Sequence, residues 1–188
     1  SSPELQKAIE EETKKAGLTV DFKLTGCHGF CQQGPIVVVE PDGVFYSQVK
    51  IEDAQEIVES HFVNNTPVER LFYKDPQTDA PIQRYQDIPF YAGQERIVLK
   101  NCGHINPEII QDSMDAGVYK GIEKVLGDMS PQDVINTIKE SGLRGRGGAG
   151  FPTGVKWGFA AGAEADQKYI ICNADEGDPG AFMDRAVL

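Results

Sequence analysis

A glycine-rich stretch at residues 144–157, RGRGGAGFPTGVKW, is the feature that most limits how this chain of 188 residues can fold. Between residues 145 and 154 it holds five glycines, which leave backbone N–H groups unshielded and permit conformations that other residues avoid. Phe151, Pro152 and Trp157 accompany these glycines, and a flexible linker would not need such residues. The stretch therefore predicts an ordered turn.

The neighbouring residues limit which ligand-binding motif this turn can be. It contains G-x-G-x-x-G at residues 145–150, but the predicted element before it is an amphipathic helix, whereas a dinucleotide fingerprint follows a strand. A P-loop is excluded because Val155 stands where Lys would be. Arg146 and Lys156 add positive charge, and a helix is expected to begin near Thr153. The turn is therefore predicted to be an anion cradle.

Polar side chains follow a predicted buried strand at residues 168–172. They are Asn173, Asp175, Glu176 and Asp178. Carboxylates repel phosphate, so beside an anion cradle they are expected to accept hydrogen bonds from sugar or ribityl hydroxyls. An EF-hand is excluded because its glycine and terminal Glu are not at the required offsets. A solvated acidic turn is the alternative.

The N-terminal third shows a different order of elements. Hydrophobic spacing and turn residues predict a helix at 3–16, a strand at 18–25, a loop at 26–35, a hairpin of 36–40 with 44–49, and a helix at 51–62. The loop carries Cys27 and Cys31, whose thiolates can converge on one metal. Two reduced loop thiols are the alternative, since Cys102 and Cys172 lie in other predicted elements and have no paired spacing.

Residues 64–100 have the composition of an extended connector, with four prolines and many polar residues. Their aromatic residues predict that this segment lies against a surface. Beyond it, the residues around Pro107 and the capping pattern at 130–133 predict helices. One of these helices ends at Gly142, and another runs from about Thr153 to Ala161.

Composition excludes several classes of protein. The chain has 18 Lys and Arg against 29 Asp and Glu, a net charge of −11, so nucleic acid is not expected as a partner. Its apolar runs are too short for a transmembrane segment, and no signal sequence is recognisable. Four cysteines predict reduced thiols and a cytoplasmic location. The first and last residues look cut, so we expect a fragment of a longer protein.

Two motifs at this spacing resemble a known family. RGRGGAGFPTGVKW followed by ICNADEGDPGAFMDR at 171–185 resembles the NADH- and FMN-binding flavoprotein subunit of complex I and of soluble NAD-linked hydrogenases and formate dehydrogenases. TGCHGFCQQGPIVVVEPDGVFYSQV, which begins at Thr25, resembles the second half of a thioredoxin-like 2Fe-2S ferredoxin domain. DEGDPG, in place of the DESEPG typical of complex I, points toward the hydrogenase type.

The resemblance implies an α/β fold in three parts. Residues 1–63 would form a thioredoxin-like ferredoxin domain that is incomplete at its N-terminus, because the first cysteine pair of that domain would precede Ser1. Residues 64–100 would be the connector. Residues 101–188 would form the N-terminal part of an FMN- and NADH-binding domain, with a 4Fe-4S cluster expected in the missing C-terminal part.

Site residues follow from the resemblance position by position. Those implied for FMN are Gly145, Arg146, Gly147, Lys156, Asn173, Asp175, Glu176 and Gly177. Phe151 and Phe159 would stack on the dinucleotide, and Asp178 would accept a hydrogen bond from a ribose hydroxyl. Cys27 and Cys31 would be two of the four 2Fe-2S ligands, and no catalytic side chain is implied.

The implied function is that of an NADH dehydrogenase-type flavoprotein, in which a hydride passes between NADH and FMN and single electrons pass onward to iron-sulfur clusters. Its partners would be other subunits of a multi-subunit redox complex, including ferredoxin-like and hydrogenase-type subunits. A non-catalytic ferredoxin-like docking segment and a zinc-binding interaction module are the two alternatives.

Overall fold

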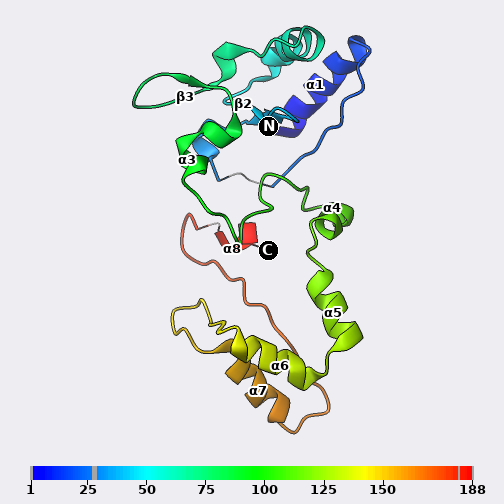
Figure 1. The fold of residues 1–188 in the computed structure, drawn as a ribbon, viewed down its shortest axis with the longest axis vertical. Helices are drawn as coiled ribbons and strands as arrows, with labels where there is room; N and C mark the ends of the chain where they lie inside the picture. Colours follow the sequence, from blue (N-terminus) through cyan, green and yellow to red (C-terminus); the bar gives the residue numbers. More distant parts are fainter. Residues whose placement is uncertain (1, 27–28, 182, 188) are drawn as a thin grey trace. The chain divides into compact units, whose positions relative to one another are not determined.

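The computed structural model describes residues 2–26, 29–181 and 183–187 and divides the chain into two compact units. The first unit comprises residues 1–109 together with 186–188, and the second comprises residues 110–185. Figure 1 traces them by colour, from blue at the N-terminus to red at the C-terminus. Each unit is described by itself.

The first unit combines short helices with two small sheets. Its elements are α1 (Ser2–Lys15), η1 (Cys31–Gln33), β1 (Val37–Val39), β2 (Val44–Tyr46), η2 (Ile51–Asp53), α2 (Ala54–Glu56), η3 (Ile57–Val63), η4 (Glu69–Leu71), β3 (Tyr73–Lys74), β4 (Pro81–Ile82), η5 (Tyr85–Asp87) and α3 (Pro89–Ala92). η3 is a π-helical turn that continues α2, so the helix predicted at 51–62 forms with irregular windings.

The second unit is helical in its described residues. Its elements are α4 (Ile110–Asp115), α5 (Lys120–Asp128), α6 (Pro131–Glu140) and α7 (Thr153–Gly162), and α8 (Met183–Val187) begins within it. The predicted cap of α6 is confirmed: the Ser130 hydroxyl accepts from the Asp133 N–H, and the Asp133 carboxylate accepts from the Ser130 N–H. Near Pro107 the helix begins later than predicted, at Ile110, after a turn in which Asn106 Oδ1 accepts from the Glu108 N–H.

The predicted hairpin forms the centre of the first unit. β1 pairs with β2 in antiparallel register, with Val37 opposite Tyr46 and Val39 opposite Val44. β2 is buried along its whole length because α1, α2 and η3 pack against Val44 and Tyr46, while residues of the second apolar cluster cover Phe45. Leu5 and Ile9 of α1 enter this core, which is why a helix with helical apolar spacing forms there.

Residues 64–100 pack against this hairpin, as their aromatic content predicts. Tyr46 forms an isolated antiparallel bridge with Phe72, and Val44 forms another with Arg84. A second apolar cluster then collects the residues Phe45, Tyr73, Ile88 and Tyr91. The segment is therefore part of the first unit's core, while the domain boundaries at 63 and 100 remain a prediction.

Two predicted strands are wrong in the described structure. Residues 18–25 and 168–172 have no regular secondary structure, and Ile170 and Ile171 are 82% and 84% exposed, so the second of these is not buried either. A strand needs a neighbour to complete its ladder of hydrogen bonds. The described sheets are β1–β2 and β3–β4, and neither contains a strand from these two segments.

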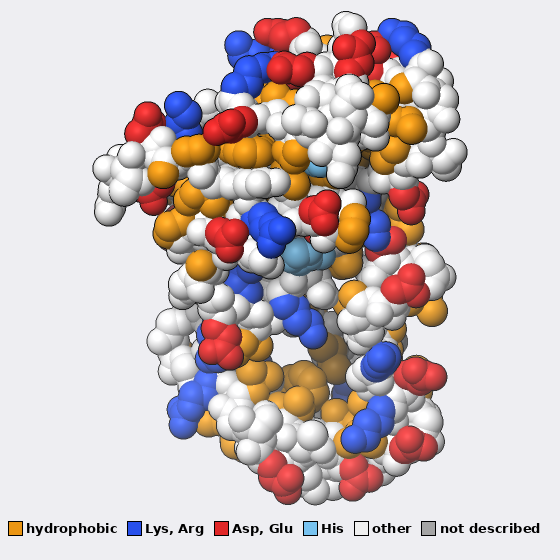
Figure 2. Space-filling model, turned by 45° about the horizontal axis from the view of Figure 1, so that its top comes forward, with side chains coloured by type: hydrophobic (Ala, Val, Ile, Leu, Met, Phe, Trp, Pro, Cys, Tyr) orange, Lys and Arg blue, Asp and Glu red, His pale blue; other side chains and the backbone are white. Residues whose placement is uncertain are grey.

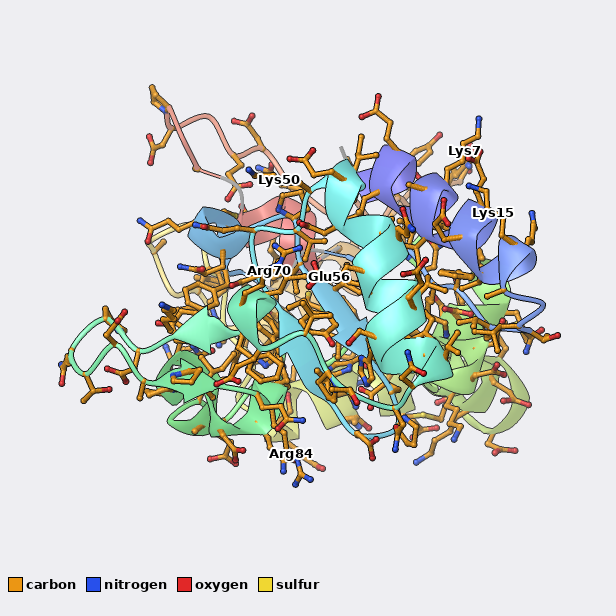
Figure 3. All side chains as sticks on the ribbon, turned by 90° about the horizontal axis from the view of Figure 1, so that it is seen from above. Lys7, Lys15, Lys50, Glu56, Arg70 and Arg84 are labelled. Carbon is orange, nitrogen blue, oxygen red and sulfur yellow. The ribbon has the colours of Figure 1, made fainter. Side chains whose placement is uncertain are left out.

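Ion pairs attach the segment that follows the helix at 51–63 to that helix. Arg70 donates to the carboxylates of Glu56 and Asp53, and the Asp53 contact measures 2.7 Å (Figure 3). Hydrogen bonds to these two acceptors raise the pKa of Arg70 above its ordinary value. Asp53 also accepts from the Lys50 N–H at 2.7 Å, so one buried carboxylate both caps the helix and holds η4.

A buried polar relay crosses the core of the first unit. The Val68 N–H donates to the Tyr46 hydroxyl at 2.9 Å, and that hydroxyl lies 2.8 Å from Nδ1 of His61. The hydroxyl oxygen accepts from Val68, and its own proton can be donated to Nδ1 of a neutral His61 imidazole. Burial lowers the pKa of His61, against a smaller opposing effect of Asp42.

This relay predicts that the chain loses stability in mild acid. The pKa of His61 is lower in the folded than in the unfolded state, so the unfolded state binds more protons as the pH falls below about 6.5. The stabilising contribution is complete above that pH and is lost as the pH falls through the folded-state pKa. Urea unfolding followed by circular dichroism between pH 8 and pH 5 measures it.

The matched control is a non-titrating side chain at the same place. His61→Gln should flatten the pH dependence of the unfolding free energy over this range, whereas the exposed His104→Gln should leave it in place. An unchanged pH profile in His61→Gln would assign the acid sensitivity to other groups.

Candidate functional site

The glycine-rich stretch forms a closed loop, which we call the glycine loop (residues 143–153). At its base the Thr153 N–H donates to the Leu143 carbonyl at 2.9 Å, and the Gly145 N–H donates to the Phe151 carbonyl at 2.9 Å. Between these bonds Arg144 and Pro152 form an antiparallel bridge. The predicted ordered turn is therefore present, between α6 and α7 (Figure 1).

Inside this closure the backbone is open. Among the described hydrogen bonds, none is donated by the successive amides of residues 146–150. Gly148 and Gly150 have φ values of +102° and +60°, which side chains disfavour, and nothing lies within 4 Å of a Cβ added at either position or at Gly147. Consecutive unshielded N–H groups of this kind form an anion-binding concavity.

Positive charge surrounds the open amides. Arg144 donates to the Gly150 carbonyl at 3.2 Å, and Arg146 donates to the Arg144 carbonyl at 3.2 Å, so both guanidinium groups lie along the loop. Lys156 is exposed in the first turns of α7, which starts at the base of the loop. The predicted helix N-terminus at Thr153 is confirmed, and its dipole adds to the attraction for an anion.

Two aromatic side chains predicted to contact a dinucleotide stand at the surface of this unit. Phe151 is 48% exposed and Phe159 is 70% exposed. Large exposed rings are available for stacking on a planar ligand. Figure 2 shows hydrophobic side chains in orange among charged ones on the face that it presents.

The acidic segment (residues 173–178) is a turn held by its own side chains. Asn173 Oδ1 accepts from the Asp175 N–H at 3.0 Å, and Glu176 Oε1 accepts from the Asp184 N–H at 2.9 Å. The described hydrogen bonds leave the exposed carboxylates of Asp175 and Asp178 unused, and Gly177 lies beside that of Asp175. Asn173 and Glu176 therefore shape the turn, while Asp175 and Asp178 present acceptors to solvent.

The glycine loop and the acidic segment are not joined in the described structure. No hydrogen bond or ion pair between described residues links them. A cavity of about 660 Å³ exists in the first unit, between α1, residues 19–25 and β1, and none of the predicted site residues lines it. The two halves of the predicted flavin site are thus present as separate pieces, and the assembled site remains a prediction.

Of the predicted metal ligands, Cys27 lies outside the described residues, and Cys31 is exposed at the start of η1. Cys102 is half-buried. Cys172 is exposed and directly precedes the acidic segment. Within the described ranges no group of three or more His, Cys, Asp or Glu side chains could hold a metal ion. The described part of the chain therefore does not assemble a complete ligand set.

The described residues of the cysteine loop, 26 and 29–35, are nevertheless held by contacts with other segments. The Gly26 N–H donates to the Ile105 carbonyl at 3.2 Å, and the Gln48 N–H donates to the Gln33 carbonyl at 2.8 Å. Between them Phe30 stacks on Phe90 with ring centroids 4.6 Å apart. Phe30 is not among the predicted site residues, although an aromatic residue directly before a candidate ligand is a signal for this anchoring role.

Comparison with known proteins places the open loop in a family. Residues 138–188, which include the end of α6, the glycine loop, α7 and the acidic segment, match the model of the Nuo51 FMN-binding domain. No described helix is long and apolar enough to cross a membrane.

Curated relatives are similar to part of this chain. The chain is 62% identical over 95 residues to HndC, a subunit of the NADP-reducing hydrogenase of Solidesulfovibrio fructosivorans, covering 50% of this chain and 19% of that protein. It is 44% identical over 94 residues to a subunit of an NADH-quinone oxidoreductase of Rhizobium meliloti, with 50% and 22% covered. It is 62% identical over 60 residues to the alpha subunit of the NAD-reducing hydrogenase HoxS of Cupriavidus necator, with 32% and 10% covered. The chain spans about a fifth or less of the length of these relatives.

Among solved structures, two of a thioredoxin-like [2Fe-2S] ferredoxin from Aquifex aeolicus are similar. One is 40% identical, with 43% of this chain and 76% of that chain covered and a TM-score of 0.36. The other is 43% identical, with 39% and 74% covered and the same TM-score.

These findings confirm the family resemblance and the α/β fold class that the motifs predict. Residues 138–188 match an FMN-binding domain, and the chain is similar to subunits named in an NADH-quinone oxidoreductase and in hydrogenases.

The ligand count predicts that this chain of 188 residues, purified and reconstituted with iron and sulfide, holds no stable 2Fe-2S cluster. Two loop thiolates cannot saturate two irons, and affinity depends on the full ligand set. Iron and sulfide assays with a visible absorption spectrum test this. A stoichiometric cluster in the unmutated chain would contradict the prediction, and Cys102→Ser and Cys172→Ser would then show whether these two thiolates complete the ligand set.

Proposed function

We propose that this chain is part of an electron-entry flavoprotein in which a hydride passes between NADH and FMN and electrons continue to iron-sulfur clusters. The observation that carries the proposal is the closed glycine loop with open amides at the start of α7, within the region that matches an FMN-binding domain. The related subunits belong, by name, to oxidoreductases and hydrogenases.

The glycine loop fits a phosphate-bearing cofactor. Its unshielded amides, the two arginines along it and Lys156 supply donors and positive charge, which is the chemistry that an FMN phosphate requires. Gly145 and Gly147 keep side chains out of this concavity, and Arg146 and Lys156 would neutralise the phosphate. When bound, FMN supplies hydride and single-electron transfer, so the protein has to provide binding and orientation.

The other site residues have supporting roles in the proposal. Phe151 and Phe159 would stack on the dinucleotide, since both rings are exposed. Asp175 and Asp178 would accept hydrogen bonds from ribityl or ribose hydroxyls, because their carboxylates face solvent without a described partner. Asn173, Glu176 and Gly177 would set the turn that presents them. No residue needs to act as a general base, because the hydride moves directly between stacked rings.

The wider assignment extends the same proposal. Cys27 and Cys31 would be two of four 2Fe-2S ligands, although the described residues do not complete that set and no step is drawn through the cluster. A 4Fe-4S cluster, ferredoxin-like and hydrogenase-type partner subunits, and a cytoplasmic location complete the proposal. Relatives that are named as subunits of larger enzymes support a multi-subunit assembly.

Loss of the cation next to the glycine loop should weaken the binding of the cofactor. In the full-length protein Lys156→Ala removes a charge-assisted hydrogen bond to the phosphate and should raise the Kd for FMN by about tenfold or more. Fluorescence titration and flavin content after gel filtration measure this.

The control for this test is Lys124→Ala, which removes an equally exposed lysine from α5 and should leave FMN binding unchanged. An equal Kd for FMN in Lys156→Ala and in the unmutated protein would show that Lys156 does not contribute to the site.

The acidic segment predicts that the full-length enzyme prefers NADH to NADPH. Carboxylates accept hydrogen bonds from ribose hydroxyls and repel a 2′-phosphate. Since one relative is named NADP-reducing and another NAD-reducing, the measurement has to be made on this protein. Steady-state kcat/KM for each nucleotide with an artificial acceptor decides the preference.

A single variant identifies the residue responsible. Asp178→Asn should narrow the gap in kcat/KM between the nucleotides if this carboxylate discriminates. Equal or greater efficiency with NADPH in the unmutated enzyme would refute the carboxylate argument, and a gap unaffected by Asp178→Asn would locate discrimination elsewhere.

A further inference from the structure

A backbone contact between α6 and α7 lies directly beneath the glycine loop. Gly154, in the first turn of α7, is buried against Lys139, in the last turn of α6. A Cβ added to Gly154 would lie 2.6 Å from the Lys139 nitrogen, 2.7 Å from its Cγ and 2.9 Å from its Cα. Real Cβ atoms do not come this close, and two of the three atoms belong to helical backbone that cannot swing aside.

The next glycine on the same face does not share this requirement. Gly158 follows one helical turn later, and its added Cβ would lie 3.6 Å from Nζ of Lys139 and 4.0 Å from Cγ2 of Ile135. These are ordinary van der Waals distances to side-chain atoms. The need for glycine is therefore specific to the end of α7 nearest the loop.

This contact is coupled to the loop by short covalent connections. Lys139 lies four residues before Leu143, and Gly154 directly follows Thr153. Leu143 and Thr153 are the two residues whose backbone hydrogen bond closes the loop at 2.9 Å. If the helices moved apart at Gly154 and Lys139, the base of the loop would therefore have to change its geometry. The open amides of residues 146–150 follow directly from that base.

We propose that Gly154 is a positioning residue: its contact with the Lys139 backbone sets the geometry in which the amides of the glycine loop receive the cofactor phosphate. Gly154 need not touch the cofactor for this role. The inference rests on the proposed function, because it assigns the phosphate to this loop.

The experiment compares FMN with riboflavin, which lacks the phosphate, on the full-length protein stripped of flavin. Gly154→Ala should raise the Kd for FMN by about tenfold or more while changing the Kd for riboflavin by less than about threefold, so discrimination between the two ligands shrinks. Gly158→Ala should leave both constants within about twofold of the unmutated values. Fluorescence titration measures all four constants.

A second variant disturbs the same contact without a clash, in case Gly154→Ala does not fold. Ile135→Ala removes the buried side chain of α6 that packs toward α7 and should reduce the FMN-to-riboflavin discrimination in the same direction, to a smaller extent. Ile88→Ala, a comparable truncation in the first unit, should leave the discrimination unchanged.

The outcomes separate the two proposals. If the unmutated protein does not bind FMN more tightly than riboflavin, the assignment of the phosphate to this loop fails together with the proposed function. If it does, and a folded Gly154→Ala or Ile135→Ala keeps the full discrimination, only the positioning role of Gly154 is overturned.

Discussion

The close approach of two helix backbones is the constraint on which the second unit depends. α6 and α7 can meet at Lys139 and Gly154 only because no side chain intervenes, and this brings the ends of the glycine loop within hydrogen-bonding distance. Closing the loop in turn holds consecutive amides open at a helix N-terminus. In the proposed function, this packing between helices prepares the loop for an anion before any charged side chain contributes.

Local signals predicted local structure well. The capping residues Ser130 and Asp133 defined the start of α6, and the turn at residues 41–43 joined two strands in the expected hairpin. These features depend on residues within a few positions of one another, so the sequence contains all the information that they need. The order of the glycine loop was also predictable, because Phe151 and Pro152 exclude a flexible linker.

Features that depend on distant partners could not be predicted in this way. Apolar alternation at residues 18–25 and the run at 168–172 indicated strands, but a strand exists only where another segment completes its hydrogen bonds. The contact of Gly154 with Lys139 and the stacking of Phe30 on Phe90 likewise join residues that no short-range pattern relates. For the site, motifs named the residues, whereas bringing the acidic segment to the glycine loop requires tertiary information.

The exposed apolar segment around Ile170 and Ile171 affects how this chain associates with itself in solution. β-branched and aromatic residues with unpaired backbone groups offer a template on which a second molecule can add a strand. The net charge of −11 opposes such association through long-range repulsion, which salt screens within about 10 Å at 0.1 M. Ionic strength should therefore control self-association of the chain: at low salt the charge repulsion opposes it, and at high salt this repulsion is screened while the apolar segment stays exposed.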